Sequence, residues 1–140
     1  MKKNALVSVS SIQSKKKEDI IEVVTPGNFY KKENCYYVVY DETELAGMEG
    51  TTTTFKINCN DNKFSLIRMG TTSTRMDFEN NKDAIVLYNT PYGPLELKID
   101  TKQLNIDVDD DGGDILIDYN LSVSGQKPQN TLLKINIKAQ

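Results

Sequence analysis

The sequence contains no histidine and no tryptophan. The lack of histidine excludes imidazole-based catalytic triads, histidine metal sites and histidine proton transfer. Alanine is also scarce, with 4 residues against 33 of valine, isoleucine and threonine, which is a composition typical of β-sheet proteins. Basic residues do not exceed acidic ones, and the formal net charge of −3 argues against bulk binding to nucleic acid or anionic membranes.

Long apolar runs are missing as well. No segment approaches the roughly 20 apolar residues of a membrane-spanning helix, and the apolar stretch near the start ends after three residues, too early for a signal peptide. The two cysteines, Cys35 and Cys59, have no nearby cysteine or histidine at metal-binding spacing, so free thiols are expected, with a disulfide or a reactive thiol as the alternatives. We therefore expect a cytoplasmic protein without a cofactor.

The chain length of 140 residues suits a single domain covering residues 1–140, with a core that needs neither disulfides nor metals. Alternation of apolar and polar residues with a period of two predicts ten to twelve short strands. They are expected at residues 4–13, 19–25, 29–32, 35–42, 51–59, 63–69, 73–79, 83–89, 95–100, 102–108, 114–124 and 130–138. Such spacing favours an antiparallel sandwich or barrel, with a loop at 43–50 that has room for one helical turn at 43–46.

The alternation also assigns the two faces of the sheet. The face expected inside carries Tyr36, Val38, Tyr40, Phe64, Leu66, Thr74, Met76, Phe78, Val86, Tyr88, Leu95, Leu97, Ile99, Ile115, Ile117, Tyr119, Leu121, Leu133, Ile135 and Ile137. The opposite face carries Arg75, Asp77, Lys98, Asp100, Asp118, Lys134 and Lys138. A curled sheet with one apolar face closes naturally into a barrel, which removes its exposed edges.

Two charged residues, Glu42 and Arg68, fall in the apolar register, each at the end of its strand, where the mouth of a barrel is expected. One interpretation is structural: they end their strands in water or pair with each other. The other makes Arg68 an anion-binding residue oriented by Glu42, because a guanidinium binds carboxylates and phosphates through paired hydrogen bonds. Hydroxyl partners would then come from Tyr40, Tyr88 and Tyr119.

An acidic segment follows later in the chain. Asp107, Asp109, Asp111 and Gly112 match the D-x-D-x-D-G pattern of a calcium loop. Strands are expected on both sides instead of helices, and position 12 is Asp118 rather than glutamate, so a solvated hairpin turn is the competing interpretation. Residues 103–126 hold six acids and no base, which makes this end of the molecule a surface for a basic partner.

Several short segments resemble the YwiB-like proteins, a bacterial family of unknown function that is similar to the calycins. They are YVVYDE at residues 37–42, TFKI at 54–57, IRMG at 67–70, MDF at 76–78, YNTPYG at 88–93 and IDYNL at 117–121. The resemblance implies an all-β fold, an antiparallel up-and-down lipocalin-like barrel of about 8–10 strands, and it carries over no catalytic residues. The chain lacks the Gly-x-Trp start of true lipocalins and the Arg-x-Tyr pair of fatty-acid-binding proteins.

These observations support two main hypotheses. The first is a cytoplasmic, non-catalytic barrel that binds a small amphipathic or anionic molecule in its interior. The alternative is a protein-interaction module with a filled core that acts through its surface or its acidic hairpin; an enzyme with chemistry independent of histidine is a third. The volume of the interior separates the first two, because ligand cavities measure roughly 300–1,000 Å³.

Overall fold

The computed structural model describes residues 2–13, 20–42, 50–70, 73–90 and 92–140, and these form ten β-strands. The predicted helical turn at 43–46 lies outside the described residues. The strands are β1 (Lys2–Gln13), β2 (Ile20–Lys32), β3 (Cys35–Asp41), β4 (Thr51–Asn58), β5 (Lys63–Gly70), β6 (Thr74–Glu79), β7 (Asp83–Thr90), β8 (Gly93–Asp109), β9 (Gly112–Val123) and β10 (Gln129–Ala139).

All ten strands belong to one antiparallel sheet, in the order β6-β5-β4-β3-β2-β1-β10-β9-β8-β7. Each strand pairs with its neighbours in the sequence, apart from β6 and β7, which stand at the two ends of the sheet. The pairing of β1 with β10, from Ala5 opposite Ala139 to Gln13 opposite Thr131, joins the two halves of the chain. The result is a nearly closed up-and-down barrel, which confirms the predicted fold.

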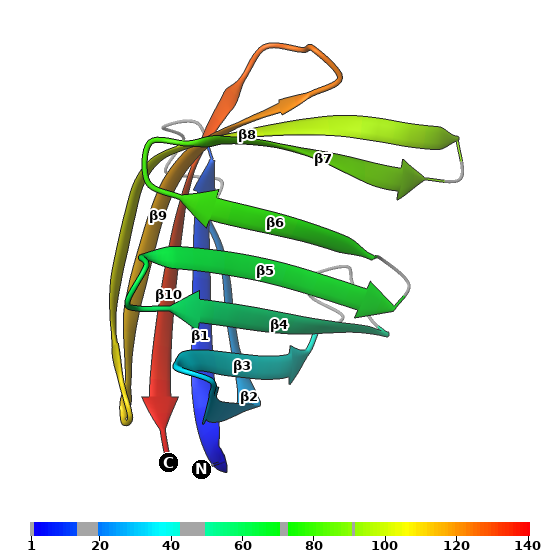
Figure 1. Cartoon of the computed structure of the whole chain (residues 1–140). Coiled ribbons are helices and arrows are strands. Elements are labelled where there is room, and N and C mark those ends of the chain that lie inside the picture. Colours follow the sequence, from blue (N-terminus) through cyan, green and yellow to red (C-terminus); the bar gives the residue numbers. More distant parts are fainter. Residues whose placement is uncertain (1, 14–19, 43–49, 71–72, 91) are drawn as a thin grey trace.

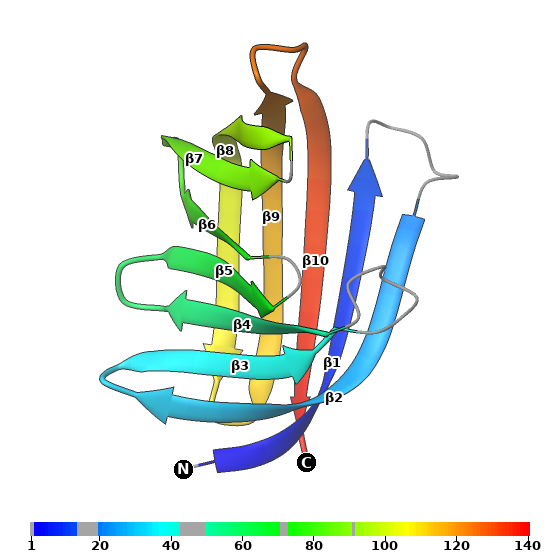
Figure 2. The ribbon, with the colours of Figure 1, turned by 90° about the vertical axis from the view of Figure 1, so that its right-hand side faces the viewer.

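The sheet curls so that its two halves face each other across the interior. β1, β9 and β10 run mostly lengthwise, while β3 to β7 cross them at a steep angle; β2 and β8 bend, so that one part of each follows either direction (Figures 1 and 2). β2 forms the corner, since residues 28–30 pair with both β1 and β3.

Two strands are longer than the sequence predicts. β2 continues through Pro26, Gly27 and Asn28, which were expected to break it. A side chain at Gly27 would press against the Val39 carbonyl oxygen at 2.9 Å, so the Pro-Gly pair marks a close approach of strands at the corner, not the end of one. Likewise, the two strands expected at 95–100 and 102–108 form one continuous β8, with a bulge between Thr101 and Gln103.

The predicted inner face lines the barrel. Phe29, Phe55, Phe64 and Phe78 are almost fully buried, and so are Ile117 and Ile135 of the opposite wall. Leu97 is half-buried. The exception is Leu95, which keeps 37% of its surface exposed although it lies in the inward register, because the β7–β8 hairpin extends past the rest of the barrel (Figure 1).

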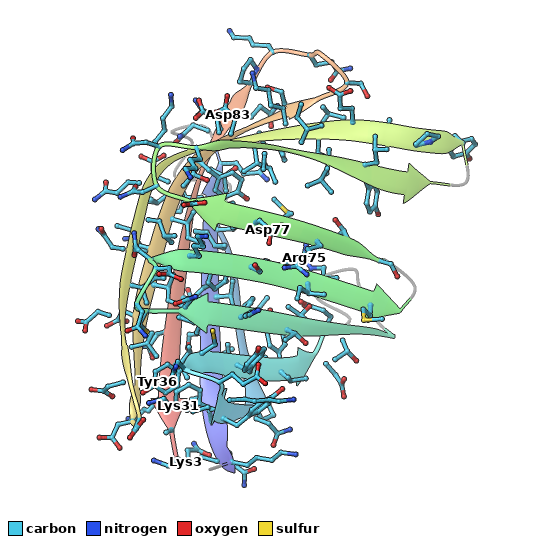
Figure 3. The ribbon with its side chains drawn as sticks, viewed as in Figure 1. Lys3, Lys31, Tyr36, Arg75, Asp77 and Asp83 are labelled. Carbon is cyan, nitrogen blue, oxygen red and sulfur yellow. The ribbon has the colours of Figure 1, made fainter. Side chains whose placement is uncertain are left out.

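One end of the barrel is closed by the β8–β9 hairpin. The Tyr36 hydroxyl donates a hydrogen bond of 2.6 Å to Asp110, and its ring stacks on Phe29 at 5.3 Å between ring centroids. The Lys3 ammonium reaches the Asp110 carbonyl oxygen at 3.0 Å, and Lys31 lies over the Tyr36 ring; Figure 3 shows Lys3, Lys31 and Tyr36 gathered at this end.

The acidic segment forms the turn of this hairpin. Asp109 accepts a hydrogen bond of 2.8 Å from the Asp111 backbone N–H, and Gly112 adopts a φ of 109°, which residues with side chains rarely adopt. Asp114 accepts a hydrogen bond from Asn136 at 2.8 Å. Within the described residues, no group of three or more acidic or thiol side chains is arranged to hold a metal ion. These contacts favour the hairpin-turn interpretation of the D-x-D-x-D-G pattern.

Candidate functional site

A polar group lies in the apolar interior where β3, β4 and β5 run side by side. Arg68 pairs with Thr53 across the β5–β4 ladder, and the Glu42 backbone N–H donates to the Thr51 carbonyl oxygen at 2.8 Å. This register brings Arg68 Nε to 3.9 Å from Glu42 Oε1, and Thr53 Oγ1 donates a hydrogen bond to the same carboxylate oxygen. The Glu42 side chain is only 3% exposed, whereas that of Arg68 is 24% exposed.

Two of the three predicted tyrosines join this group. Tyr40 donates a hydrogen bond to Glu42, and its burial, followed by the Glu42 charge, raises the pKa of the Tyr40 hydroxyl far above its usual value. Tyr119 hydrogen-bonds to Thr131, and burial raises the pKa of the Tyr119 hydroxyl as well. Both tyrosines are therefore neutral hydrogen-bonding groups at physiological pH. Tyr88 is half-buried on β7 and lies apart from the residues that line the cavity described next.

A cavity of about 200 Å³ opens beside the polar group. Its lining combines the polar group with apolar side chains from both walls of the barrel: Val9, Ser11, Val23, Tyr40, Glu42, Leu66, Arg68, Met76, Tyr119 and Leu133. Four of the five predicted site residues, Tyr40, Glu42, Arg68 and Tyr119, are thus brought together. A volume of this size is far above the roughly 10–15 Å³ that holds one water molecule, so the interior is not completely filled by side chains.

Arg68 leaves one hydrogen-bonding position open. Its Nε atom is buried, and no hydrogen-bond acceptor reaches it among the described residues. The nearest carboxylate oxygen, on Glu42, lies at 3.9 Å, beyond hydrogen-bond distance. A buried donor without an acceptor costs about 1–3 kcal/mol, so an oxygen atom supplied by a bound molecule would stabilise this arrangement.

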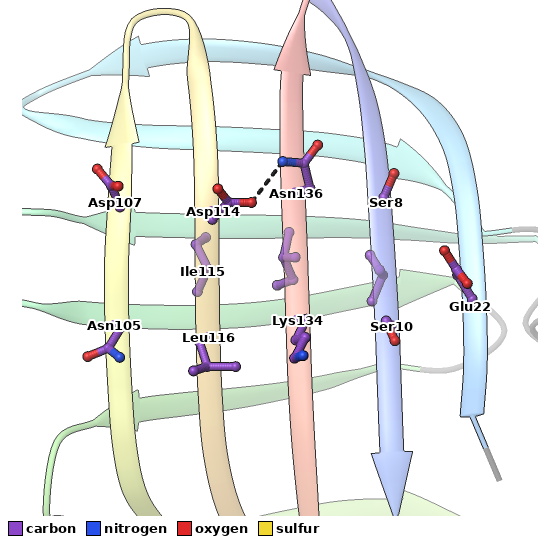
Figure 4. A pocket seen from close by; sticks show the side chains of 12 residues that line it. Ser8, Ser10, Glu22, Asn105, Asp107, Asp114, Ile115, Leu116, Lys134 and Asn136 are labelled. Carbon is purple, nitrogen blue, oxygen red and sulfur yellow. Dashed lines mark hydrogen bonds between the residues drawn. The ribbon is translucent and has the colours of Figure 1, made fainter. Parts of the chain in front are cut away.

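A larger hollow, with a volume of about 450 Å³, lies on the outer face of β1, β2, β8, β9 and β10 (Figure 4). It is lined by short polar side chains such as Ser8 and Ser10 and by charges of both signs, among them Glu22 and Lys134. All five residues predicted from the sequence lie outside it. We place the candidate site in the interior because that cavity is lined by the Glu42–Arg68 pair, whose Arg68 Nε donor has no acceptor in the part of the chain that the structure describes.

Cys35 and Cys59 are free thiols, the first buried and the second exposed, so the expectation of unpaired cysteines is confirmed. Partial desolvation of its sulfur raises the pKa of the Cys59 thiol, which disfavours the reactive thiolate form. No helix among the described residues is long and apolar enough to cross a membrane.

Fold and site together define an antiparallel β-barrel with a small, partly polar interior cavity. Residues 7–135 match the family described as a domain of unknown function (DUF1934), and the chain belongs to that family. The resemblance found in the sequence motifs is confirmed by the relatives.

One relative is the uncharacterized beta-barrel protein YwiB of Bacillus subtilis (strain 168). It is 28% identical over 118 residues, which cover 84% of this chain and 80% of that protein. The crystal structure of the ywiB protein from Bacillus subtilis superimposes with a TM-score of 0.85, at 24% sequence identity, over 99% of this chain and 93% of the other. At this identity the structural likeness shows the shared fold.

Sequence reasoning missed two polar members of the site, Thr53 and Thr131. Thr53 belongs to the run of four threonines at 51–54, where alternation with Phe55 and Ile57 places it in the inward register. Thr131 precedes Leu133 by two residues and shares its face. Threonine is less hydrophobic than valine, so hydrophobicity does not mark these two residues as buried, but their register in the strand does.

The charge pair generates a stability prediction. In Arg68→Met, Glu42 stays buried without its cation, and we expect the free energy of unfolding to fall by about 2–3 kcal/mol, below the usual range because Arg68 is partly exposed. The double variant Glu42→Gln/Arg68→Met should recover most of this loss, since glutamine keeps an oxygen for the Thr53 hydroxyl. Urea unfolding monitored by tyrosine fluorescence measures both.

Arg75→Met is the matched control, because Arg75 is the chain's other arginine and pairs with Asp77 at 3.2 Å on the exposed outer face of β6 (Figure 3). It should change the free energy of unfolding by less than about 0.5 kcal/mol. Equal losses in Arg68→Met and Arg75→Met would contradict the assignment of a buried pair.

The closed end of the barrel generates a pH prediction. The hydrogen bond to Asp110, with burial, raises the pKa of Tyr36 to about 12 from its usual 10. Because the folded state holds this proton more tightly than the unfolded state, its contribution to stability is complete below pH 10 and is lost as the pH rises toward 12. The free energy of unfolding should fall less between pH 9 and 11.5 in Tyr36→Phe than in the wild type, and urea titrations at both pH values test this. An equally steep fall would refute it.

Proposed function

We propose that this protein is a non-catalytic binding protein that holds a small amphipathic or anionic molecule in its barrel, acting in the cytoplasm and independently of nucleic acid and membranes. The observation that carries the proposal is the buried Arg68 Nε donor, which has no acceptor among the described residues and lies beside a cavity of about 200 Å³. The free thiols Cys35 and Cys59 fit a reducing compartment.

The lining of the cavity suits a molecule with two unlike ends. Leu66, Met76 and Leu133 offer apolar contacts, while the guanidinium of Arg68 offers a charged donor to a carboxylate or another oxygen acceptor. Glu42 balances the charge of Arg68 and limits its movement. The volume lies below the roughly 300–1,000 Å³ of sites for drug-sized ligands, so the ligand is a small one, on the scale of a short-chain acid.

A binding role is favoured over catalysis by the state of the polar groups. The raised pKa values of Tyr40 and Tyr119 keep both hydroxyls protonated, so neither supplies a nucleophile near neutral pH. Glu42 already accepts hydrogen bonds from Thr53 and Tyr40, which occupies it as a structural acceptor. The resemblance to calycins supports the interior as the binding space by analogy of fold.

Hexanoate serves as the test molecule, with hexanol as its uncharged counterpart. We expect hexanoate to shift the backbone amide signals of residues around the cavity, such as Leu66 and Leu133, in two-dimensional NMR spectra. The double variant Glu42→Gln/Arg68→Met, chosen to preserve the fold, should weaken binding at least about tenfold, a loss of about 1.4 kcal/mol.

The Arg75→Met variant should bind hexanoate like the wild type. If hexanoate shifts only outer-surface signals, or if the double variant binds as tightly as the wild type, the interior site is wrong. Equal binding of hexanol and hexanoate would show that the cavity selects for apolar shape and that Arg68 does not recognise an anion.

A further inference from the structure

The two end strands of the sheet differ in what they present to the outside. The outward side chains of β6 include Arg75 and Asp77, which are more than half exposed, and such charges protect a sheet end from association. β7 instead presents Ile85 and Leu87, each 65% exposed, and residues 84–90 carry no charge. The outer face of β7 is therefore apolar where that of β6 is charged.

The exposed apolar surface is concentrated on the β7–β8 hairpin. Among the described residues, the large apolar side chains with substantial exposure are Val24, Met69, Ile85, Leu87, Tyr92 and Leu95, and the last four belong to this hairpin. The hairpin extends beyond the crossing strands (Figure 1), so its outer face is accessible to another molecule. Clustered exposed apolar side chains mark interaction surfaces in soluble proteins.

On the outer face of the hairpin, the register of β7 and β8 places charged side chains of β8 beside the apolar side chains of β7. Ile85 lies opposite Lys98, and Leu87 lies opposite Glu96, all four on the outer face. We call these four residues the outer patch. Along β7 both of its members are apolar, whereas along β8 the two charges have opposite signs.

This arrangement is complementary to itself, and we propose that the outer patch binds a second copy of this chain. In this dimer the outer faces of the two copies meet, and a two-fold axis lies between them, perpendicular to β7 and β8. The strands of the second copy therefore run in the opposite direction. Ile85 then stacks on Leu87 of the other copy, and Lys98 faces Glu96 of the other copy. Each contact occurs twice, as in other interfaces with two-fold symmetry.

The charges of the outer patch also argue against a charged membrane or a charged peptide as its binding partner. Its one cation and one anion cancel, so the patch has no net attraction for an anionic lipid surface or a strongly charged peptide. Lys98 lies 3.8 Å from Asp83 in its own chain, but both side chains are more than half exposed. Such a pair is weak, so Lys98 can turn toward Glu96 of the other copy.

Association through four central residues on each side is expected to be weak. Interfaces of small area are typical of transient complexes, so the dimer should form at high protein concentration. Sedimentation velocity of the full chain from about 10 µM to about 1 mM covers free energies of association between about −7 and −4 kcal/mol. We expect the weight-average sedimentation coefficient of the wild type to rise across this range.

Charge reversal gives the sharpest test. Lys98→Glu sets glutamate against glutamate twice and should lower the association constant at least about tenfold. The double variant Lys98→Glu/Glu96→Lys restores opposite charges across the two-fold axis and should restore association. Leu87→Lys should abolish it, whereas Val24→Lys, which changes an exposed apolar side chain on the outer face of β2, should leave it unchanged.

The proposal is overturned if the wild type stays monomeric at about 1 mM, or if Leu87→Lys associates like the wild type. It is also overturned if Lys98→Glu and the double variant associate equally, since the two-fold arrangement requires them to differ. Far-ultraviolet circular dichroism of each variant confirms that the barrel is folded, so a loss of association is attributable to the patch.

Discussion

The structure depends on one constraint: side chains alternate between the inside and the outside of a curled sheet whose two halves are joined by the pairing of β1 with β10. Each strand contributes every second residue to a shared interior, so a single register shift would expose a whole row of apolar side chains. The phenylalanines at 29, 55, 64 and 78 and the isoleucines of β9 and β10 meet because this alternation holds in nearly every strand. The same alternation turns Glu42 and Arg68 toward the inside and so produces the polar group in the interior.

The cavity lies beside these two charges. Glu42 and Arg68 both line the cavity, together with Tyr40 and Tyr119. Thr53 and Tyr40 satisfy Glu42 from two sides, while Arg68 keeps a donor toward the open space. The interior is therefore apolar around most of its circumference and polar at one place, which suits recognition of one end of a small molecule.

The sequence allowed most of the fold to be predicted, because alternation is a local property. It placed Tyr40, Glu42, Arg68 and Tyr119 on the inner face, and those four line the cavity. Tyr88 has the same local pattern but lies apart from the cavity, since its strand ends the sheet and part of the hairpin projects past the barrel. The ends of the strands were harder to predict from the sequence. Pro26 and Gly27 normally mark turns, yet here they form a corner within β2. Whether a strand ends or bends at such a pair depends on the curvature of the whole sheet, which no local sequence pattern indicates.

The pairing of β1 with β10 has a consequence for the order of folding. Residues 5 and 139 are partners in the ladder, so this contact closes a loop of nearly the whole chain and carries a large entropic penalty. The meander from β1 to β6 pairs only strands that are neighbours in the sequence, so it can assemble earlier. Until β10 pairs with β1, one edge of β1 has amide and carbonyl groups that are not bonded to another strand. We therefore expect the pairing of β1 with β10 to form late in folding, and we expect β1 to be open to strand exchange with other molecules until then.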